Sequence, residues 1–281
     1  MDESTTAAVA DWAGCSVTTV TELDGGQVGS VHRVDLADGR RVVVKTAETD
    51  LRTEAKMLAH LRSVGELRVP EVYHVTPDLL VLEFVAGGST ISPAVERDLA
   101  ERLAALHATD ADRFGFPFDT LTGAYCQPNP WRDDWATFFG EERLSHAATR
   151  AREEGVLPAH LGERLTTLGD DLPGMLAHDP TPSLVHGDVW SANLLTDGET
   201  VRAFLDPACY YADPEVELAY AEWTGVAGDA FFERYRAVAG VAPGYDERRH
   251  VYRLYPLLTH VRHFGEAYLE PLDETLETLG Y

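Results

Sequence analysis

Residues 183–206 read SLVHGDVWSANLLTDGETVRAFLD. Apolar runs flank the polar segment HGDVWSAN, and a second carboxylate, Asp206, follows thirteen positions after Asn193. Between these two residues lie two short β patterns joined at Asp197-Gly198, a dipeptide that favours a tight hairpin turn. We therefore expect a rigid polar loop, followed by a hairpin that leads to a second carboxylate.

The spacing within this loop is typical of phosphoryl-transfer enzymes. Asp188 precedes Asn193 by five positions, as Asp precedes Asn in the kinase pattern H-R-D-x-x-x-x-N. Asp206 stands where kinases place a metal-binding aspartate. One aspartate can orient and deprotonate a hydroxyl, while an amide and a second carboxylate hold magnesium on the nucleotide phosphates. The spacing thus predicts transfer of a phosphoryl group from a nucleotide.

Three features near the N-terminus fit a nucleotide site. Gly25, Gly26 and Gly29 lie between two predicted strands, where missing side chains would let backbone N–H groups approach a phosphate. Lys45 ends the apolar strand VVVK. Glu54 falls on the apolar stripe of a predicted helix, and a carboxylate on a buried face needs a cation. We expect a Lys45–Glu54 ion pair.

The charge balance limits the partners. The chain of 281 residues has 47 acidic and 23 basic residues, a net charge of −24, and only two lysines, Lys45 and Lys56. Such a charge repels nucleic acid and anionic membranes, so neither is expected as a partner. It favours a salt-loving host, although an Arg-rich, GC-rich genome would give a milder version. Without an apparent signal or spanning segment, a cytoplasmic location is the default expectation.

The periodicity predicts an α+β fold with two unequal lobes. Alternating β patterns and one main helix fill residues 1–86, which we expect to form a nucleotide-binding lobe with a hinge at 83–90. Helical patterns dominate residues 87–281, the expected catalytic and substrate-binding lobe. In kinase-like folds the segment joining the lobes offers backbone groups to adenine, so the Glu83 carbonyl and the Val85 N–H are expected to face the base.

Several segments together resemble the fructosamine kinase (ketosamine 3-kinase) family, which shares the fold of aminoglycoside and choline kinases. The resemblance covers nearly the whole chain, and its most specific segments are HGDVWSANLL, FLDPACYYADPEVELAY, GGQVGSVHRV, VVVKT and LYPLLTHVRHFGEAYL. It implies a two-lobed protein-kinase-like fold, with a small antiparallel β lobe and a larger, mainly helical lobe. It also implies ATP and Mg²⁺ as cofactors.

The resemblance assigns roles to individual residues. Asp188 becomes the catalytic base, Asn193 and Asp206 the magnesium ligands, Lys45 the ligand of the α- and β-phosphates, and Glu54 its partner. The implied reaction phosphorylates a ketosamine hydroxyl, O3 in the family, and the resulting ester decomposes to release the amine. The amine component is either a small molecule or a glycated protein lysine.

The substrate side rests on aromatic and polar residues. Trp190 has an aromatic face suited to a sugar, and with Ser191 it is the pair that best separates this family from choline and aminoglycoside kinases. Asn129 and Trp131 are further expected substrate residues, although Trp131 and Trp135 have a spacing that also suits a helix core.

Two other functions stay open at this stage. One is a small-molecule kinase for another hydroxyl, such as that of an aminoglycoside or choline. The other is a nucleotide-binding pseudoenzyme, against which the intact Lys45, Asp188, Asn193 and Asp206 weigh. The sequence leaves the oligomeric state unknown.

Overall fold

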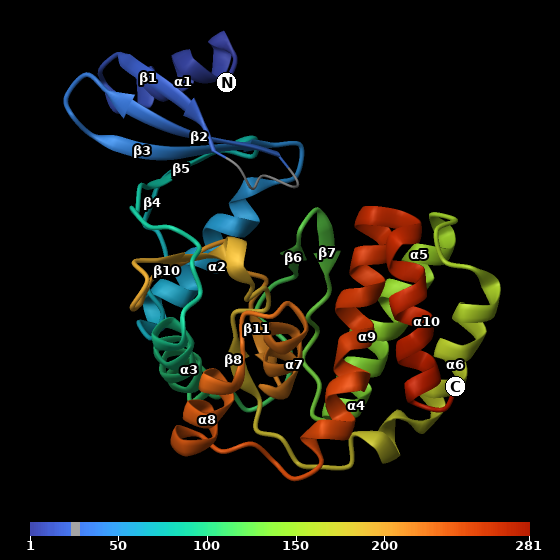
Figure 1. The fold of residues 1–281 in the computed structure, drawn as a ribbon. Helices are drawn as coiled ribbons and strands as arrows, with labels where there is room; N and C mark the ends of the chain where they lie inside the picture. The colour runs from blue at the N-terminus through green and yellow to red at the C-terminus, as the bar shows by residue number, and fades with distance from the viewer. Residues whose placement is uncertain (24–28) are drawn as a thin grey trace.

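The computed structural model describes residues 1–23 and 29–281. It has two lobes, an N-terminal antiparallel sheet with two helices and a larger part that is mostly helical (Figure 1). The predicted α+β class and two-lobed architecture are confirmed. Among the described residues, no helix combines the length and the apolar run that a bilayer crossing needs.

The N-terminal sheet is antiparallel throughout and has the strand order β1-β2-β3-β5-β4. Its elements, in chain order, are α1 (Glu3–Ala13), β1 (Val17–Glu22), β2 (Gly29–Leu36), β3 (Arg41–Ala47), α2 (Leu51–Val64), β4 (Val72–Val75) and β5 (Leu79–Glu83). The β2–β3 turn contains Asp38-Gly39, a dipeptide that favours tight hairpin turns, and Gly39 has φ +88°, which glycine adopts readily.

The side chains of β3 explain how the sheet is covered. Successive side chains of a strand point to opposite faces. Val42 and Val44 are buried in a small apolar cluster that includes Val9 of α1. Lys45 must therefore point to the other face, where its partner Glu54 lies on α2. The alternation of this strand thus directs the one lysine of the sheet away from the α1 face.

Helix α1 was not among the predicted elements. It buries only Val9, so its apolar pattern is weak. Its ends are well marked: the Asp2 carboxylate accepts a hydrogen bond from the Thr5 N–H at 2.7 Å, and Gly14 closes the helix in the left-handed conformation. In the sequence, this helix is therefore marked by its capping residues, Asp2 and Gly14, and not by hydrophobic periodicity.

The larger lobe contains the remaining helices and three short β pairs. In chain order its elements are α3 (Pro93–His107), β6 (Thr120–Thr122), β7 (Tyr125–Gln127), α4 (Trp135–Phe138), a π-helical turn (Phe139–Ser145), α5 (His146–Glu153), α6 (Ala159–Met175), β8 (Ser183–Val185), a 3₁₀ turn (Ser191–Asn193), β9 (Leu194–Thr196), β10 (Val201–Phe204), β11 (Tyr210–Ala212), α7 (Glu215–Trp223), α8 (Asp229–Val238), α9 (Tyr245–Phe264), a 3₁₀ helix (Gly265–Tyr268) and α10 (Leu269–Thr278). The predicted β9–β10 hairpin is confirmed, whereas α6, β6, β7, β8 and β11 were not predicted.

The segment between the lobes is tied to the hairpin of the larger lobe. Gly88 and Thr196 exchange two backbone hydrogen bonds of 2.8 and 2.7 Å, one donated by each N–H. A side chain at Gly87 would meet the Leu195 Cβ at 2.9 Å, so the two segments approach closely. This contact fixes the chain between β5 and α3 against β9. The domain boundary at 86/87 stays a prediction.

Candidate active site

Two loops, separated in sequence by the β9–β10 hairpin, lie side by side in the larger lobe. The first follows β8 and carries Asp188 and Asn193, and the second follows β10 and carries Asp206. The strands β8 and β11 pair on one side of these loops, and β9 and β10 pair on the other. Backbone hydrogen bonds from Ala208 N–H to the His186 carbonyl (2.8 Å) and from Leu205 N–H to the Asn193 carbonyl (2.9 Å) join them. The short β runs that bracket HGDVWSAN in the sequence thus hold these loops together.

Gly187 is the residue that allows this close approach. It has φ +85°, and a Cβ there would stand 2.3 Å from the Ala208 carbonyl oxygen. No other residue fits at this contact, because both the backbone conformation and the space require a missing side chain. The glycine of HGD is therefore fixed by the packing of the second loop.

Asp188 is held by hydrogen bonds at both carboxylate oxygens. Its Oδ2 accepts from Asn193 Nδ2 at 2.8 Å, and its Oδ1 accepts from the Tyr220 hydroxyl at 2.8 Å. Burial of Asp188 disfavours its charged form and raises its pKa to about 7, although the hydrogen bond from Tyr220 lowers the pKa in part. A carboxylate with a pKa near neutrality is well matched to accept a proton from a hydroxyl.

Asp206 has an unusual backbone. Its φ is +51°, and among the described residues it is the only non-glycine with a positive φ. Such a conformation is tolerated by Asp but is uncommon, and it often marks a functional position. Its carboxylate forms an ion pair with the Lys45 ammonium of the N-terminal lobe. Asp206 thus joins the two lobes across the cleft.

Lys45 lies between two carboxylates. Its Nζ is 2.7 Å from Glu54 Oε1, which confirms the predicted ion pair, and it also contacts Asp206. Burial by itself disfavours the ammonium, but the charges of Asp206 and Glu54 outweigh it, so the pKa of Lys45 is raised. Lys45 therefore stays cationic within the cleft.

The oxygen ligands at the site suit a hard cation. Asn193 Nδ2 donates to both the backbone carbonyl and the carboxylate of Asp188, which leaves its amide oxygen without a donor among the described residues. That oxygen and the Asp206 carboxylate are the ligand types that Mg²⁺ prefers. The Asp206 carboxylate already pairs with a cation, Lys45. The residues present thus fit a magnesium ion.

A cleft of about 560 Å³ opens between the lobes. It is lined by residues of the sheet, of the two loops described above and of helices α7 and α9, and the lining includes Gly29, Lys45, Asp188, Trp190 and Asp206. The volume is within the range of small-molecule sites. The predicted base, metal ligands and phosphate-binding lysine therefore share one cavity with Trp190.

The predicted nucleotide contacts are only partly described. Gly29 lines the cleft, and a Cβ there would meet the Thr46 carbonyl oxygen at 2.2 Å. Gly25 and Gly26 lie outside the described residues. Glu83 ends β5, where its carboxylate accepts from Arg68 at 2.7 Å, and neither Glu83 nor Val85 is among the described residues that line the cleft. Their backbone contacts with adenine stay predictions.

Three of the four predicted substrate residues do not reach the cleft lining. Trp190 lines it, whereas Ser191, Asn129 and Trp131 are absent from its described lining. Asn129 is buried, and its amide is used by internal partners: it donates to the Thr120 hydroxyl at 2.8 Å and accepts from Arg143 at 2.6 Å. Internal contacts thus saturate the amide of Asn129.

Neither Trp131 nor Trp135 is among the described residues that line the cleft. The ring of Trp131 is 6.1 Å from that of Tyr211. Trp135 is buried in the core and donates a hydrogen bond of 3.0 Å to the Tyr252 hydroxyl. The packing expected for a helix core holds for Trp135, and the structure does not bring Trp131 to the cleft.

The sequence did not predict two important residues of the site, Tyr220 and Glu217, which both lie on α7. The buried Glu217 carboxylate accepts hydrogen bonds from the backbone N–H of Gly187 (2.6 Å) and of His186 (3.2 Å), and from His107 Nε2 at 2.9 Å. The Tyr235 hydroxyl in turn contacts His107 Nδ1 at 2.7 Å. The stretch PEVELAY signals a helix, and only its position after Asp206 could have suggested that it packs under the catalytic loop.

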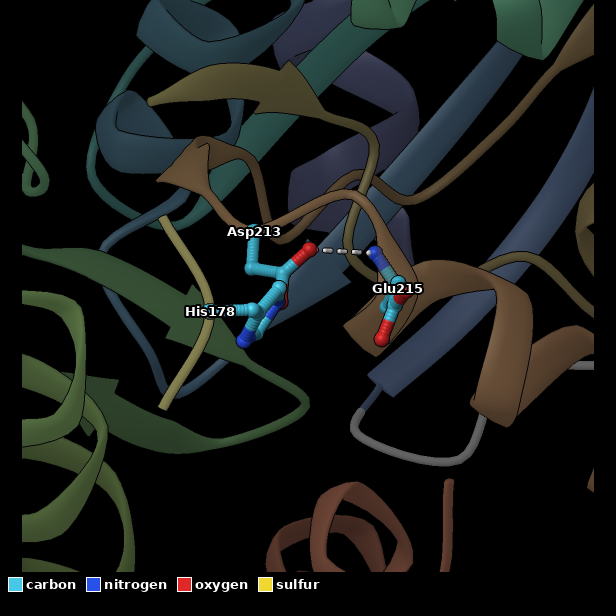
Figure 2. Close-up of side chains that lie close together, drawn as sticks. All are labelled: His178, Asp213 and Glu215. Atoms are coloured by element: carbon cyan, nitrogen blue, oxygen red, sulfur yellow. Dashed lines mark hydrogen bonds and ion pairs between the residues drawn. The ribbon is translucent and has the colours of Figure 1, made fainter. Parts of the chain in front are cut away.

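A second cluster of potential metal ligands has a structural explanation. His178, Asp213 and Glu215 bring ligand atoms within 4.8 Å of one another (Figure 2). Asp213, however, already accepts from His178 Nε2 at 2.7 Å and from the Glu215 N–H at 3.0 Å. Two hydrogen bonds of 2.7 Å from Arg248 engage the Glu215 carboxylate. A cation would have to displace these donors, so the cluster is a network that anchors the start of α7.

Lys45 allows a direct test of the nucleotide site. We expect Lys45→Ala to raise the KM for ATP by about 10- to 100-fold, because a charge-assisted contact contributes about 1.5–3 kcal/mol. Steady-state kinetics with varied ATP measure this. The matched control is Lys56→Ala, the other lysine, which is exposed on α2 and not among the described residues lining the cleft. An unchanged KM for ATP in Lys45→Ala would contradict the assigned role.

Comparison with known proteins places the chain in a family. It is similar in structure to a Thermobifida fusca protein described as a "putative fructosamine-3-kinase", with a TM-score of 0.87 and 28% identity, covering 99% of this chain and 98% of that one. It is 33% identical to a Vibrio cholerae protein named "Probable ketoamine kinase" (92% of this chain, 91% of the relative) and 37% identical to one of the same name from Synechocystis (80% and 77%).

These similarities extend over the regions described above, and not only over the catalytic loop. The model of the fructosamine kinase family matches residues 1–280, which is nearly the whole chain. Both lobes, the cleft between them and the loops that carry Asp188, Asn193 and Asp206 fall within this match. The chain therefore belongs to the fructosamine kinase family.

Proposed function

We propose that this protein is an ATP-dependent kinase that phosphorylates a ketosamine hydroxyl, O3, and thereby starts deglycation of an amine. The observation that carries the proposal is the shared cleft, in which Asp188 lies with Asn193, Asp206, Lys45 and Trp190. Membership in the fructosamine kinase family supports the substrate class.

The geometry supports a base-assisted transfer. Asp188 accepts the proton of the sugar hydroxyl, whose oxygen attacks the γ-phosphorus of ATP as the bond to the ADP oxygen breaks. Asn193 orients the Asp188 carboxylate through its 2.8 Å hydrogen bond. Lys45 binds the phosphate oxygens with a charge that both neighbouring carboxylates maintain. Asn193 and Asp206 would hold Mg²⁺, which when bound would neutralise phosphate charge.

Positioning and electrostatics carry most of the rate in such a reaction. The 3-phosphate ester stands on the carbon next to the sugar carbonyl, and its decomposition frees the amine. Trp190 offers an aromatic face for the sugar within the cleft.

A substrate panel tests this function. Purified protein with ATP and Mg²⁺ is offered fructosyl-lysine, a glycated protein, an aminoglycoside and choline, while ADP and free amine are measured. We expect rapid ADP formation with a ketosamine and amine release from it. Rapid use of the aminoglycoside or choline with the ketosamines untouched would overturn the substrate assignment. ATP binding without any turnover would favour a pseudoenzyme.

The net charge leads to a prediction about salt. We expect the melting temperature and kcat to rise with KCl up to about 2 M, because salt at 1 M shortens the screening length to about 3 Å and relieves repulsion among the excess acidic groups. Thermal unfolding and initial rates across a KCl series measure this. Sucrose at matched osmolality is the control without ions. Maximal stability in dilute buffer would contradict a halophilic adaptation.

A further inference from the structure

One side of the cleft is formed by five aromatic side chains, Tyr220, Trp223, His260, Phe264 and Tyr268, which we call the aromatic wall. All five line the cleft that contains Asp188. The His260 ring is at its centre, with centroid distances of 5.1 Å to Trp223, 5.4 Å to Phe264 and 4.8 Å to Tyr268. Tyr220 and Trp223 are 6.1 Å apart. The wall is thus one continuous aromatic surface.

Helical spacing explains how the wall forms. Tyr220 and Trp223 are three positions apart on α7, and His260 and Phe264 are four positions apart on α9, so each pair shares a helix face. Helices α7 and α9 pack against each other near the middle of the larger lobe (Figure 1). Gly265, at φ +68°, ends α9, and the 3₁₀ helix that follows brings Tyr268 back against His260.

One ring of the wall is exposed to solvent, and the other four are partly buried. Phe264 is 44% exposed, and it is one of four large hydrophobic side chains exposed in the described part of the chain. The other three, Val20, Tyr73 and Val238, are not among the described residues that line the cleft. An exposed aromatic ring beside a catalytic base is a feature of a binding surface.

The charges around the wall favour a cationic ligand. Lys45 is the only lysine or arginine among the described residues that line the cleft, which also include the carboxylates of Glu54, Asp188, Asp206 and Glu217. Lys45 is already paired with Glu54 and Asp206. The cleft thus carries an excess of negative charge before any metal or nucleotide binds.

His260 and His263, which both line the cleft, carry no positive charge at neutral pH. His260 Nδ1 is 2.7 Å from the Pro256 carbonyl oxygen, to which it donates, and burial lowers the pKa of His260. Burial also lowers the pKa of His263, which lines the cleft nearby. Both rings are therefore neutral at neutral pH, and the wall presents electron-rich faces without a competing charge.

The wall begins at the catalytic base. Tyr220 donates to Asp188 Oδ1, the carboxylate oxygen that Asn193 does not use. A sugar hydroxyl that donates its proton to Asp188 must therefore lie beside the Tyr220 ring. The remainder of such a substrate has a path along Trp223 and His260 towards Phe264.

We propose that the aromatic wall binds the protonated amine of the ketosamine, with the faces of Trp223 and Phe264 as its main contacts. This inference rests on the proposed function. The amine of an alkyl ketosamine is protonated at neutral pH, and an ammonium group over an aromatic face is attracted to the ring. The wall thereby distinguishes ketosamines from neutral sugars, and Trp223 is a specificity-determining residue.

A matched pair of ligands tests the proposal. N-butyl-1-amino-1-deoxyfructose carries the cationic amine, and 1-O-butylfructose has the same length but a neutral ether. We expect calorimetry to show that the amine binds the wild type about 10-fold more tightly than the ether. Trp223→Leu should reduce this preference to about 3-fold or less, and Trp223→Phe, which keeps an aromatic face, should retain most of it.

Two further variants complete the design. Phe264→Leu changes a ring that is 44% exposed and should also reduce the preference for the amine. Trp12→Leu makes the same change as Trp223→Leu on α1, outside the described lining of the cleft, and should leave both affinities unchanged. The KM for ATP should stay the same in all variants.

The outcomes separate this inference from the proposed function. Equal binding of amine and ether by the wild type, or equal losses for both in Trp223→Leu, would overturn the role of the wall in amine recognition. If the wild type prefers the amine in calorimetry but phosphorylates neither ligand, the kinase function fails while the amine site stands. If it phosphorylates both with equal kcat/KM and equal affinity, the function stands and the inference fails.

Discussion

Replacement of Asp188 by Asn is expected to lower kcat by about 10²- to 10⁴-fold, the usual size of a general-base contribution. In wild type, Asn193 Nδ2 and the Tyr220 hydroxyl each donate a hydrogen bond of 2.8 Å to one carboxylate oxygen of Asp188. The amide has the same shape: its oxygen can still accept from Asn193, and its NH₂ group can donate to the Tyr220 hydroxyl oxygen. It cannot accept the proton of the sugar hydroxyl. Affinity for ATP should stay within about threefold, because the assigned phosphate ligand, Lys45, is unchanged. Steady-state kinetics and nucleotide titration measure the two effects.

Asp206→Asn serves as the contrasting variant on the neighbouring loop. Asp206 faces the Lys45 ammonium rather than Asn193, and it is an assigned magnesium ligand. We expect this variant to require more Mg²⁺ for half-maximal activity, whereas Asp188→Asn should keep the wild-type requirement. Near-normal kcat in Asp188→Asn would remove the base from the mechanism. Identical metal dependence in the two variants would show that their roles are not separate.

The parts of the fold that could be predicted depend on local signals. The β9–β10 hairpin follows from alternation around Asp197-Gly198, and β2 and β3 follow from alternation around Asp38-Gly39. The Lys45–Glu54 ion pair could be predicted for a similar reason. A carboxylate on the apolar stripe of α2 needs a cation, and the strand nearest in sequence supplies one at 2.7 Å.

The site residues that the sequence did not predict depend on packing between distant segments. Tyr220 and Glu217 read as ordinary positions of α7, and their roles appear only when that helix lies under the catalytic loop. Asn129 was expected at the substrate because of the family resemblance, but the buried partner Arg143, fourteen positions later, uses its amide oxygen. Such contacts have no periodic signal in the sequence.

Glu217 is the position where a single-atom change is expected to be most costly for the fold. In Glu217→Gln an amide NH₂ group replaces one of the two carboxylate oxygens. It then faces N–H donors, either that of Gly187 or those of His186 and His107, and cannot accept a hydrogen bond from them. Losing charge-assisted hydrogen bonds at a buried site should lower the free energy of unfolding by about 3 kcal/mol. We also expect kcat to fall by about 10²-fold, because displacement of the Asp188 loop by about 1 Å is enough for such a loss.

The matched control lies on the same helix. Glu222 pairs with Arg249 at 2.6 Å and with Arg253 at 2.7 Å, but its side chain is 24% exposed, so solvent can replace these partners. Glu222→Gln should therefore lower the free energy of unfolding by about 1 kcal/mol or less. Urea unfolding of both variants, followed by circular dichroism, makes the comparison. Equal losses would show that helix α7 responds as a whole, and that the Glu217 carboxylate has no special role under the catalytic loop.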